Sequence, residues 1–339
     1  MQKPWIWIPI VLIVVGGGIY IVRHGQEQGG NASSGEVPSP RQKARVPGSA
    51  SAHESSPASG NEDELKFQRR LAQLQAQLNE GGAAYTLAAE ELIKIGTRES
   101  IRMLVWDIAN RAQTSETYVA LHKLAELDNR EVADWLLELL PELPNSAEQG
   151  FLQYRMIADI IGTKATPEAL SSVGALIQNS PDGQTRDLLL DAMRSAGSPD
   201  SVPVLMQFAG QSDWQVRDRG SVSASAAAAL GRQGTPENVQ YLFALRAGEP
   251  DAEAPGTVGL DRVKSPKAVP VLKRIAQGAE SAYQDPNSRV IAIRVLGNID
   301  HEDGWSALQT LQDDPNAEIS QAAKQTLNQV GNRLGLQFE

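Results

Sequence analysis

Beyond residue 61, apolar residues recur at helical spacing in segments of about ten residues that short polar breaks separate. In one such segment Val202, Leu205 and Phe208 lie three residues apart, which places them on one face of a helix. We find no segment among these repeats that alternates between apolar and polar residues well enough for a strand. The pattern therefore predicts an all-α fold.

The openings of these helices are variants of one phrase: GSPDSVPVL from Gly197, GTPENVQYL from Gly234 and KSPKAVPVL from Lys264. In each, Ser or Thr supplies an N-cap oxygen, and proline takes the first helical position, where its missing N–H costs nothing. Aligned on that proline, seven openings follow at steps of 30 to 37 residues, at Arg98, Arg130, Pro167, Pro199, Pro236, Pro266 and Glu302. A period of this length indicates stacked repeats.

Each opening helix is followed by a polar break and then by a second helix with a small, apolar face. The second helices are clearest at Leu188–Met193, Ala224–Leu230, Ile291–Leu296 and Ala322–Leu327. Hairpins of this size cannot bury their apolar faces alone, so neighbours must cover one another. We therefore expect an α-solenoid of about seven helical hairpins over residues 61–339. The unit at 247–265 departs from the pattern, with an acidic break and a stunted second helix, and marks either a kink or a functional loop.

Some breaks carry the pattern Asp-x-x-Val-Arg, most clearly Asp213 to Arg217 before SASAAAALG, and again DPNSRV before IAIRVLGNI. Over residues 160–331 the chain thus resembles HEAT repeats, of the HEAT-like type described in phycobilisome lyases. The resemblance implies an α-solenoid whose second helices line a concave surface. It also implies that Asp and Arg bond between neighbouring units, which gives a structural ladder of Asp213, Arg217, Asp285 and Arg289.

The N-terminal part of the chain has a different character. After a flank of residues 1–4, residues 5–22 hold no charge and would span about 27 Å as a helix, close to the thickness of a bilayer. We expect a single-pass transmembrane helix that acts as an uncleaved anchor; a cleaved signal peptide is the alternative. Residues 23–60 are rich in Gly, Ser and Pro and predict a disordered linker.

Charges on the two sides of the apolar segment favour opposite orientations. Lys3 favours an N-terminus inside the cell, whereas Arg41, Lys43 and Arg45 lie beyond the span, near the limit where such charges count. We expect the repeat domain on the periplasmic side of a bacterial inner membrane, with the cytoplasmic orientation as the alternative.

The sequence carries no recognisable catalytic constellation. It has no cysteine, its four histidines lack metal-ligand spacing, and no phosphate loop, serine elbow or dinucleotide fingerprint is present. We therefore expect no enzyme activity, cofactor or metal, although a site assembled between repeats would escape this search. Beyond residue 60 there are 26 basic and 38 acidic side chains, a net charge of −12, which disfavours nucleic acid as a partner.

These features predict a membrane-tethered scaffold that binds a protein or peptide in the groove of the solenoid. A lyase or chaperone-lyase of the HEAT-like type and a structural spacer in the envelope are the alternatives. Basic residues of the inner helices and tryptophans near the breaks are the candidate contacts, namely Arg186, Trp214, Arg219, Arg232, Arg294 and Trp305. The identity of the partner, the pathway and the oligomeric state stay open.

Overall fold

The computed structural model describes residues 12–15, 18–21, 59–143, 151–179, 183–211, 221–248 and 251–338. The chain divides into two compact units, Met1–Ser56 and Pro57–Glu339.

In the first unit, strands β1 (Leu12–Val15) and β2 (Gly18–Ile21) pair antiparallel, with Leu12 opposite Ile21. Over these positions the backbone is extended where the sequence analysis expects a helix. The reason is composition, because Ile and Val restrict their own side-chain rotamers in a helix and pack well in a strand. The other positions of 5–22 lie outside the described residues, so the membrane-spanning helix stays a prediction. Linker positions 23–58 also lie outside them, and positions 59–60 belong to the first helix of the repeat unit.

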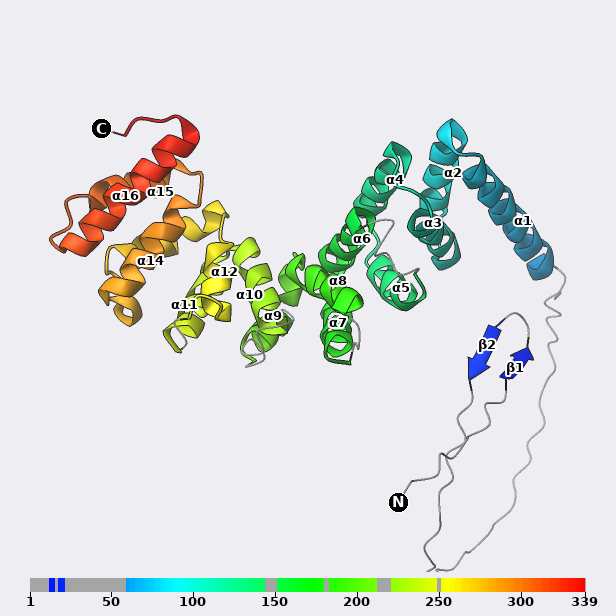
Figure 1. The fold of residues 1–339 in the computed structure, drawn as a ribbon, viewed down its shortest axis with the longest axis horizontal. Coiled ribbons are helices and arrows are strands. Elements are labelled where there is room, and N and C mark those ends of the chain that lie inside the picture. Colours follow the sequence, from blue (N-terminus) through cyan, green and yellow to red (C-terminus); the bar gives the residue numbers. More distant parts are fainter. Residues whose placement is uncertain are drawn as a thin grey trace, which may run out of the picture. The chain divides into compact units, whose positions relative to one another are not determined.

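The second unit consists of helical hairpins that follow one another in chain order (Figure 1). The first helices of the hairpins are α1 (Ser59–Glu80), α3 (Arg98–Asn110), α5 (Glu131–Leu139), α7 (Pro167–Asn179), α9 (Val202–Ala209), α11 (Pro236–Gly248), α13 (Val269–Ala276) and α15 (Glu302–Leu311). The second helices are α2 (Gly82–Ile95), α4 (Ser115–Glu126), α6 (Phe151–Lys164), α8 (Gly183–Arg194), α10 (Val222–Gln233), α12 (Pro255–Asp261), α14 (Pro286–Gly297) and α16 (Ala317–Leu334). Short 3-10 turns include η1 (Leu140–Glu142), η2 (Pro199–Ser201), η4 (Pro266–Ala268) and η5 (Ser281–Tyr283).

The helices form two layers. Second helices contact second helices, in the pairs α2–α4, α4–α6, α6–α8, α8–α10, α10–α12 and α14–α16. First helices contact first helices, in the pairs α1–α3, α3–α5, α5–α7, α7–α9, α11–α13 and α13–α15. This two-layer stack of hairpins is an α-solenoid, so the predicted all-α repeat architecture is confirmed for this unit.

The seven predicted openings coincide with the starts of first helices. Helices α7 and α11 begin at Pro167 and Pro236, and the turns η2 and η4 begin at Pro199 and Pro266 and run directly into α9 and α13. Arg98 and Glu302 begin α3 and α15, and Arg130 precedes α5. One further hairpin, α1–α2, comes before these seven, which gives eight in the part of the chain from residue 59 to 338 that the structure describes.

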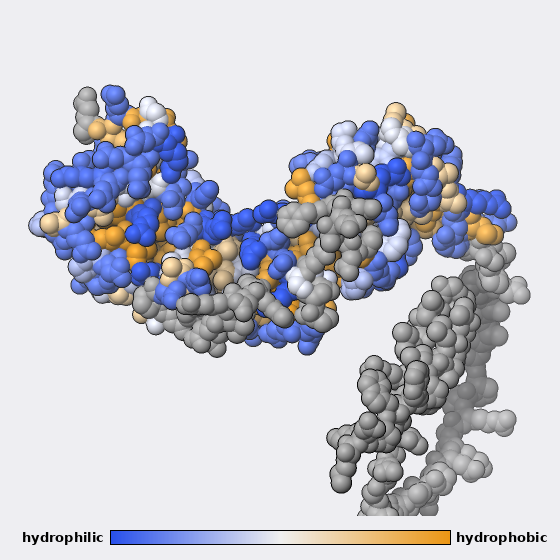
Figure 2. All heavy atoms as spheres, viewed as in Figure 1, coloured by the Kyte–Doolittle hydropathy of each residue, from blue (hydrophilic) through white to orange (hydrophobic). Residues whose placement is uncertain are grey.

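One continuous apolar core runs through the stack, from Leu71 in α1 to Leu327 in α16. Hydrophilic and hydrophobic side chains are interspersed over the face that Figure 2 shows. Each hairpin therefore contributes to a core that its neighbours complete, as expected when a single hairpin cannot bury its own apolar face.

Polar bonds link the ends of successive second helices. Near the end of a second helix, a long side chain donates to a carbonyl at the end of the preceding one: Lys164 to Leu127, Gln233 to Ala196 at 3.2 Å, and Arg333 to Gly297 at 2.9 Å. Carbonyls in the last turn of a helix lack intrahelical donors, and cations there also oppose the negative end of the helix dipole. These bonds repeat every 36 or 37 residues, so they also hold the register of the stack.

A second kind of junction involves residues of the predicted structural ladder. Arg289 donates through Nε to the carbonyl of Ala276 at 2.8 Å, and it pairs with Asp314 of the next hairpin. Asp285 instead caps its own helix α14, accepting a bond from the backbone N–H of Ser288 at 2.9 Å. Asp213 and Arg217 lie outside the described residues.

We expect Asp285→Ala to lower the free energy of unfolding by about 1 kcal/mol at neutral pH, because the cap of α14 is lost. The bonds from Ser288 lower the pKa of Asp285 in the folded protein. A depressed folded-state pKa means that this contribution is present above the unfolded pKa of roughly 3.9 and is lost as pH falls through the folded value. Urea unfolding followed by circular dichroism at pH 7 and pH 2.5 measures both effects.

The matched control is Asp285→Asn, because asparagine retains the capping oxygen but does not titrate. It should retain most of the stability at pH 7. A deficit in Asp285→Ala that stays the same at both pH values would contradict the assignment of a charged cap.

Candidate functional site

Four successive second helices, α6, α8, α10 and α12, line a groove of about 260 Å³. Its charged lining residues are Arg155, Asp159, Asp191, Arg194, Arg232 and Arg262. Between them lie the small side chains of Ser195, Ala224 and Ala228, with Val258 at the α12 end. The groove thus combines a floor of small residues with long charged side chains around it.

The charges in the groove are only partly neutralised. Arg194 pairs at 2.6 Å with Asp191, which lies three residues earlier in α8, and Ser195 donates to Asp159. Arg155 and Arg262 are exposed and form no ion pair with any described residue. Four arginines against two aspartates give the lining a net charge of +2, within a domain whose net charge is −12.

Glycines bring the helices that line the groove close together. A Cβ added at Gly162 of α6 would lie 2.1 Å from the carbonyl oxygen of Ala192 in α8, and one at Gly231 of α10 would lie 2.0 Å from that of Gly259 in α12. Both contacts are with backbone, so the helices approach to a separation that only glycine permits. The short α12 is therefore a packed part of the second-helix layer that contributes Val258 and Arg262 to the groove.

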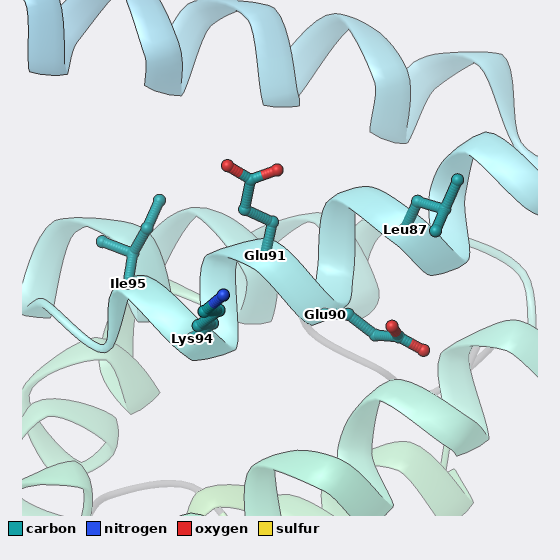
Figure 3. A pocket seen from close by; sticks show the side chains of 5 residues that line it. All are labelled: Leu87, Glu90, Glu91, Lys94 and Ile95. Atoms are coloured by element: carbon teal, nitrogen blue, oxygen red, sulfur yellow. The ribbon is translucent and has the colours of Figure 1, made fainter.

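A second hollow, of about 650 Å³, lies along α2 and is lined by Leu87, Glu90, Glu91, Lys94 and Ile95. Figure 3 shows Glu91 directed towards α1 and Glu90 directed away from it. Glu91 accepts a bond from Nε of Arg70 in α1 at 2.9 Å, and this bond lowers the pKa of Glu91. Glu90 pairs with Lys123 of α4.

The two carboxylates of this hollow thus bond to cations of the neighbouring helices, which ties α2 into the stack. They offer no free acid–base pair to a substrate.

Of the residues predicted to contact a partner, Arg232 lines the groove. Arg294 is exposed on α14, beyond the groove. Arg186 donates to the carbonyl of Ile177 at 2.7 Å, the same bond that Arg289 makes in its own hairpin. Trp305 is half-buried and packs against Phe338 with ring centroids 6.0 Å apart.

Trp214 and Arg219 lie outside the described residues. Arg155, Arg194 and Arg262 were not predicted as candidate contacts. A signal for two of them was present, because Arg194, Arg232 and Arg262 follow one another at steps of 38 and 30 residues, close to the repeat steps of 30 to 37.

Among the residues that the structure describes, no three or more His, Cys, Asp or Glu side chains gather where they could hold a metal ion. No described helix is both long enough and apolar enough to cross a bilayer.

Residues 170–258 match the family model for HEAT repeats, which confirms the predicted HEAT-repeat resemblance over that part of the chain. The finer resemblance to the type found in phycobilisome lyases stays a prediction. A search of the curated proteins finds no relative of this sequence. Among solved structures, human deoxyhypusine hydroxylase in complex with glycerol is similar at 16% identity and a TM-score of 0.26. That match covers 71% of this chain and 99% of the hydroxylase chain. A TM-score this low supports no argument about function or arrangement.

Proposed function

We propose that this protein is a membrane-tethered, non-enzymatic scaffold that binds a protein partner through the second-helix layer of its solenoid. The observation that carries the proposal is the groove across α6, α8, α10 and α12. Four different hairpins contribute to it, so the surface exists only when the repeats are stacked. Stacked repeats commonly present extended binding surfaces of this kind, and HEAT repeats are typical of interaction scaffolds.

The tether rests on residues 5–22 and on the linker that follows. In lipid, an open two-stranded sheet would leave backbone N–H and C=O groups unpaired, whereas a helix pairs nearly all of its own. We therefore infer that residues 5–22 become helical when they insert into a bilayer. A flexible linker of residues 23–60 would then let the repeat domain reach roughly 35 Å from the surface, on the periplasmic side.

Capture of partners from solubilised membranes tests the scaffold. The tagged full chain should retain a specific protein, and a chain that lacks residues 61–339 should not, because the binding surface belongs to the repeats. Retention of the same proteins by both chains, or of none by either, would contradict the proposal.

A further inference from the structure

We infer that the groove across α6, α8, α10 and α12 binds an extended peptide segment that carries several acidic residues. The inference rests on the proposed scaffold function and specifies the chemistry of its partner.

The charge of the groove selects for anions. Arg155 and Arg262 stand at its two ends, on α6 and α12, and no described carboxylate neutralises them. Arg232 makes only a long bond, of 3.4 Å, to the carbonyl of Arg194. These three guanidinium groups therefore retain donors for incoming carboxylates, and arginine can bind each carboxylate through two parallel bonds.

The floor of the groove favours an extended backbone. Ala224 and Ala228 present only methyl groups, so a peptide main chain can approach α10 closely. Asp159 and Asp191 also line the groove and still have oxygen lone pairs that can accept bonds from peptide N–H groups. Cations and acceptors in one groove suit a main chain that carries acidic side chains.

The dimensions set the length of the segment. Packed helices lie 8–10 Å apart, so crossing from α6 to α12 covers three steps, or roughly 27 Å. An extended chain advances about 3.4 Å per residue, so about eight residues span the groove. Three of the four arginines keep donors for carboxylates, so a segment of this length should carry about three acidic residues.

A polyphosphate chain fits this surface less well. The domain as a whole is acidic, with a net charge of −12, and it would repel a long polyanion. The two aspartates in the groove would also face the phosphates. A short peptide with three carboxylates can instead place its backbone N–H groups opposite these aspartates and its carboxylates opposite the arginines.

The test uses the full chain in mild detergent and a fluorescent nonapeptide of three Glu-Ser-Gly repeats with blocked ends. Its control peptide has Gln in place of Glu. We expect fluorescence anisotropy to show binding of the Glu peptide only, weakened as salt rises from 50 to 300 mM because the groove is open to solvent. The double variant Arg155→Glu/Arg262→Glu should weaken binding roughly tenfold or more, since both ends become repulsive.

Neither substituted arginine bonds to another described residue, so the double variant should fold like the native chain. Its matched control is Lys273→Glu, which makes the same kind of charge change at an exposed position of α13 in the first-helix layer. We expect the control to bind the Glu peptide as the native chain does.

Equal binding of the Glu and Gln peptides would overturn the inference. So would a loss of binding in Lys273→Glu as large as that in the double variant. A third contrary result is a short single-stranded oligonucleotide that displaces the labelled Glu peptide at a lower concentration than unlabelled Glu peptide does. These results would leave the scaffold proposal standing if the full chain still captured a membrane partner. Loss of that capture would instead remove the scaffold proposal itself.

Discussion

Replacing Gly231 with alanine is expected to lower the free energy of unfolding by about 2 to 3 kcal/mol, the range in which overpacking a tight contact falls. The new methyl group would lie 2.0 Å from the carbonyl oxygen of Gly259 and 2.9 Å from its carbonyl carbon. Both atoms belong to the backbone of α12, so no side-chain rotation relieves the clash, and α10 and α12 must move apart. Urea unfolding followed by circular dichroism measures the loss.

The matched control is Gly248→Ala at the end of α11, where an added Cβ would meet no atom within 4 Å. That substitution should be neutral or slightly stabilising, because alanine is the better helix former. Equal stability of Gly231→Ala and Gly248→Ala would contradict the close approach of α10 and α12. It would also contradict the groove that these two helices help to line.

Replacing Asp314 with alanine is expected to cost about 3 kcal/mol, because it leaves the guanidinium of Arg289 without its ionic partner. Only 14% of the Arg289 side chain and 11% of the Asp314 side chain are exposed. Removing one partner of a buried pair is costly because the remaining charge stays desolvated. The pair joins two hairpins, so the loss should appear as earlier unfolding of α14 to α16 in hydrogen exchange.

An exposed pair of the same chemistry is the control. Arg98 and Glu138 also pair between hairpins, but their side chains are 53% and 54% exposed. Glu138→Ala should therefore cost 1 kcal/mol or less. The double variant Arg289→Met/Asp314→Leu removes both charges and should recover much of the loss from Asp314→Ala. Equal losses from Asp314→Ala and Glu138→Ala would show that burial does not set the strength of the junction.

The positions of the helices could be predicted because local chemistry sets them. Proline begins a helix at Pro167 and Pro236 without losing a backbone bond. Thr97 and Thr114 cap α3 and α4, and each also exchanges side-chain bonds with the third residue of its helix. These signals lie within a few residues of one another, so they can be recognised without knowing the fold.

The groove could not be predicted in the same way. It joins residues from Arg155 to Arg262, which come together only when four hairpins stack in register. The closeness of that stacking depends on Gly162 and Gly231, and no local pattern distinguishes them from glycines that merely end helices. The resemblance to HEAT repeats implied that the second helices line one surface, but not which of their arginines share it.

The departure of the unit at 247–265 from the repeat pattern was recognised from sequence, but its packing was not. Among the described residues, α12 and α14 do not pack against each other as the other successive second helices do, and the turn η5 contacts α11 instead. Tyr283 of η5 packs on Phe243 of α11 with centroids 5.3 Å apart and donates to the carbonyl of Gln240 at 3.1 Å. Such compensation between hairpins arises from tertiary contacts, which the acidic break at 247–254 does not reveal.

Site-specific photo-crosslinking of the full chain in cells that produce it tests the central claim, that the second-helix layer is the binding face. A photo-reactive residue at Val258 would lie in the groove without removing a charge, and one at Lys273 would lie on the first-helix layer. The account predicts a discrete crosslinked protein from position 258 and none from position 273. Crosslinks from position 273 alone, or from neither position, would contradict it.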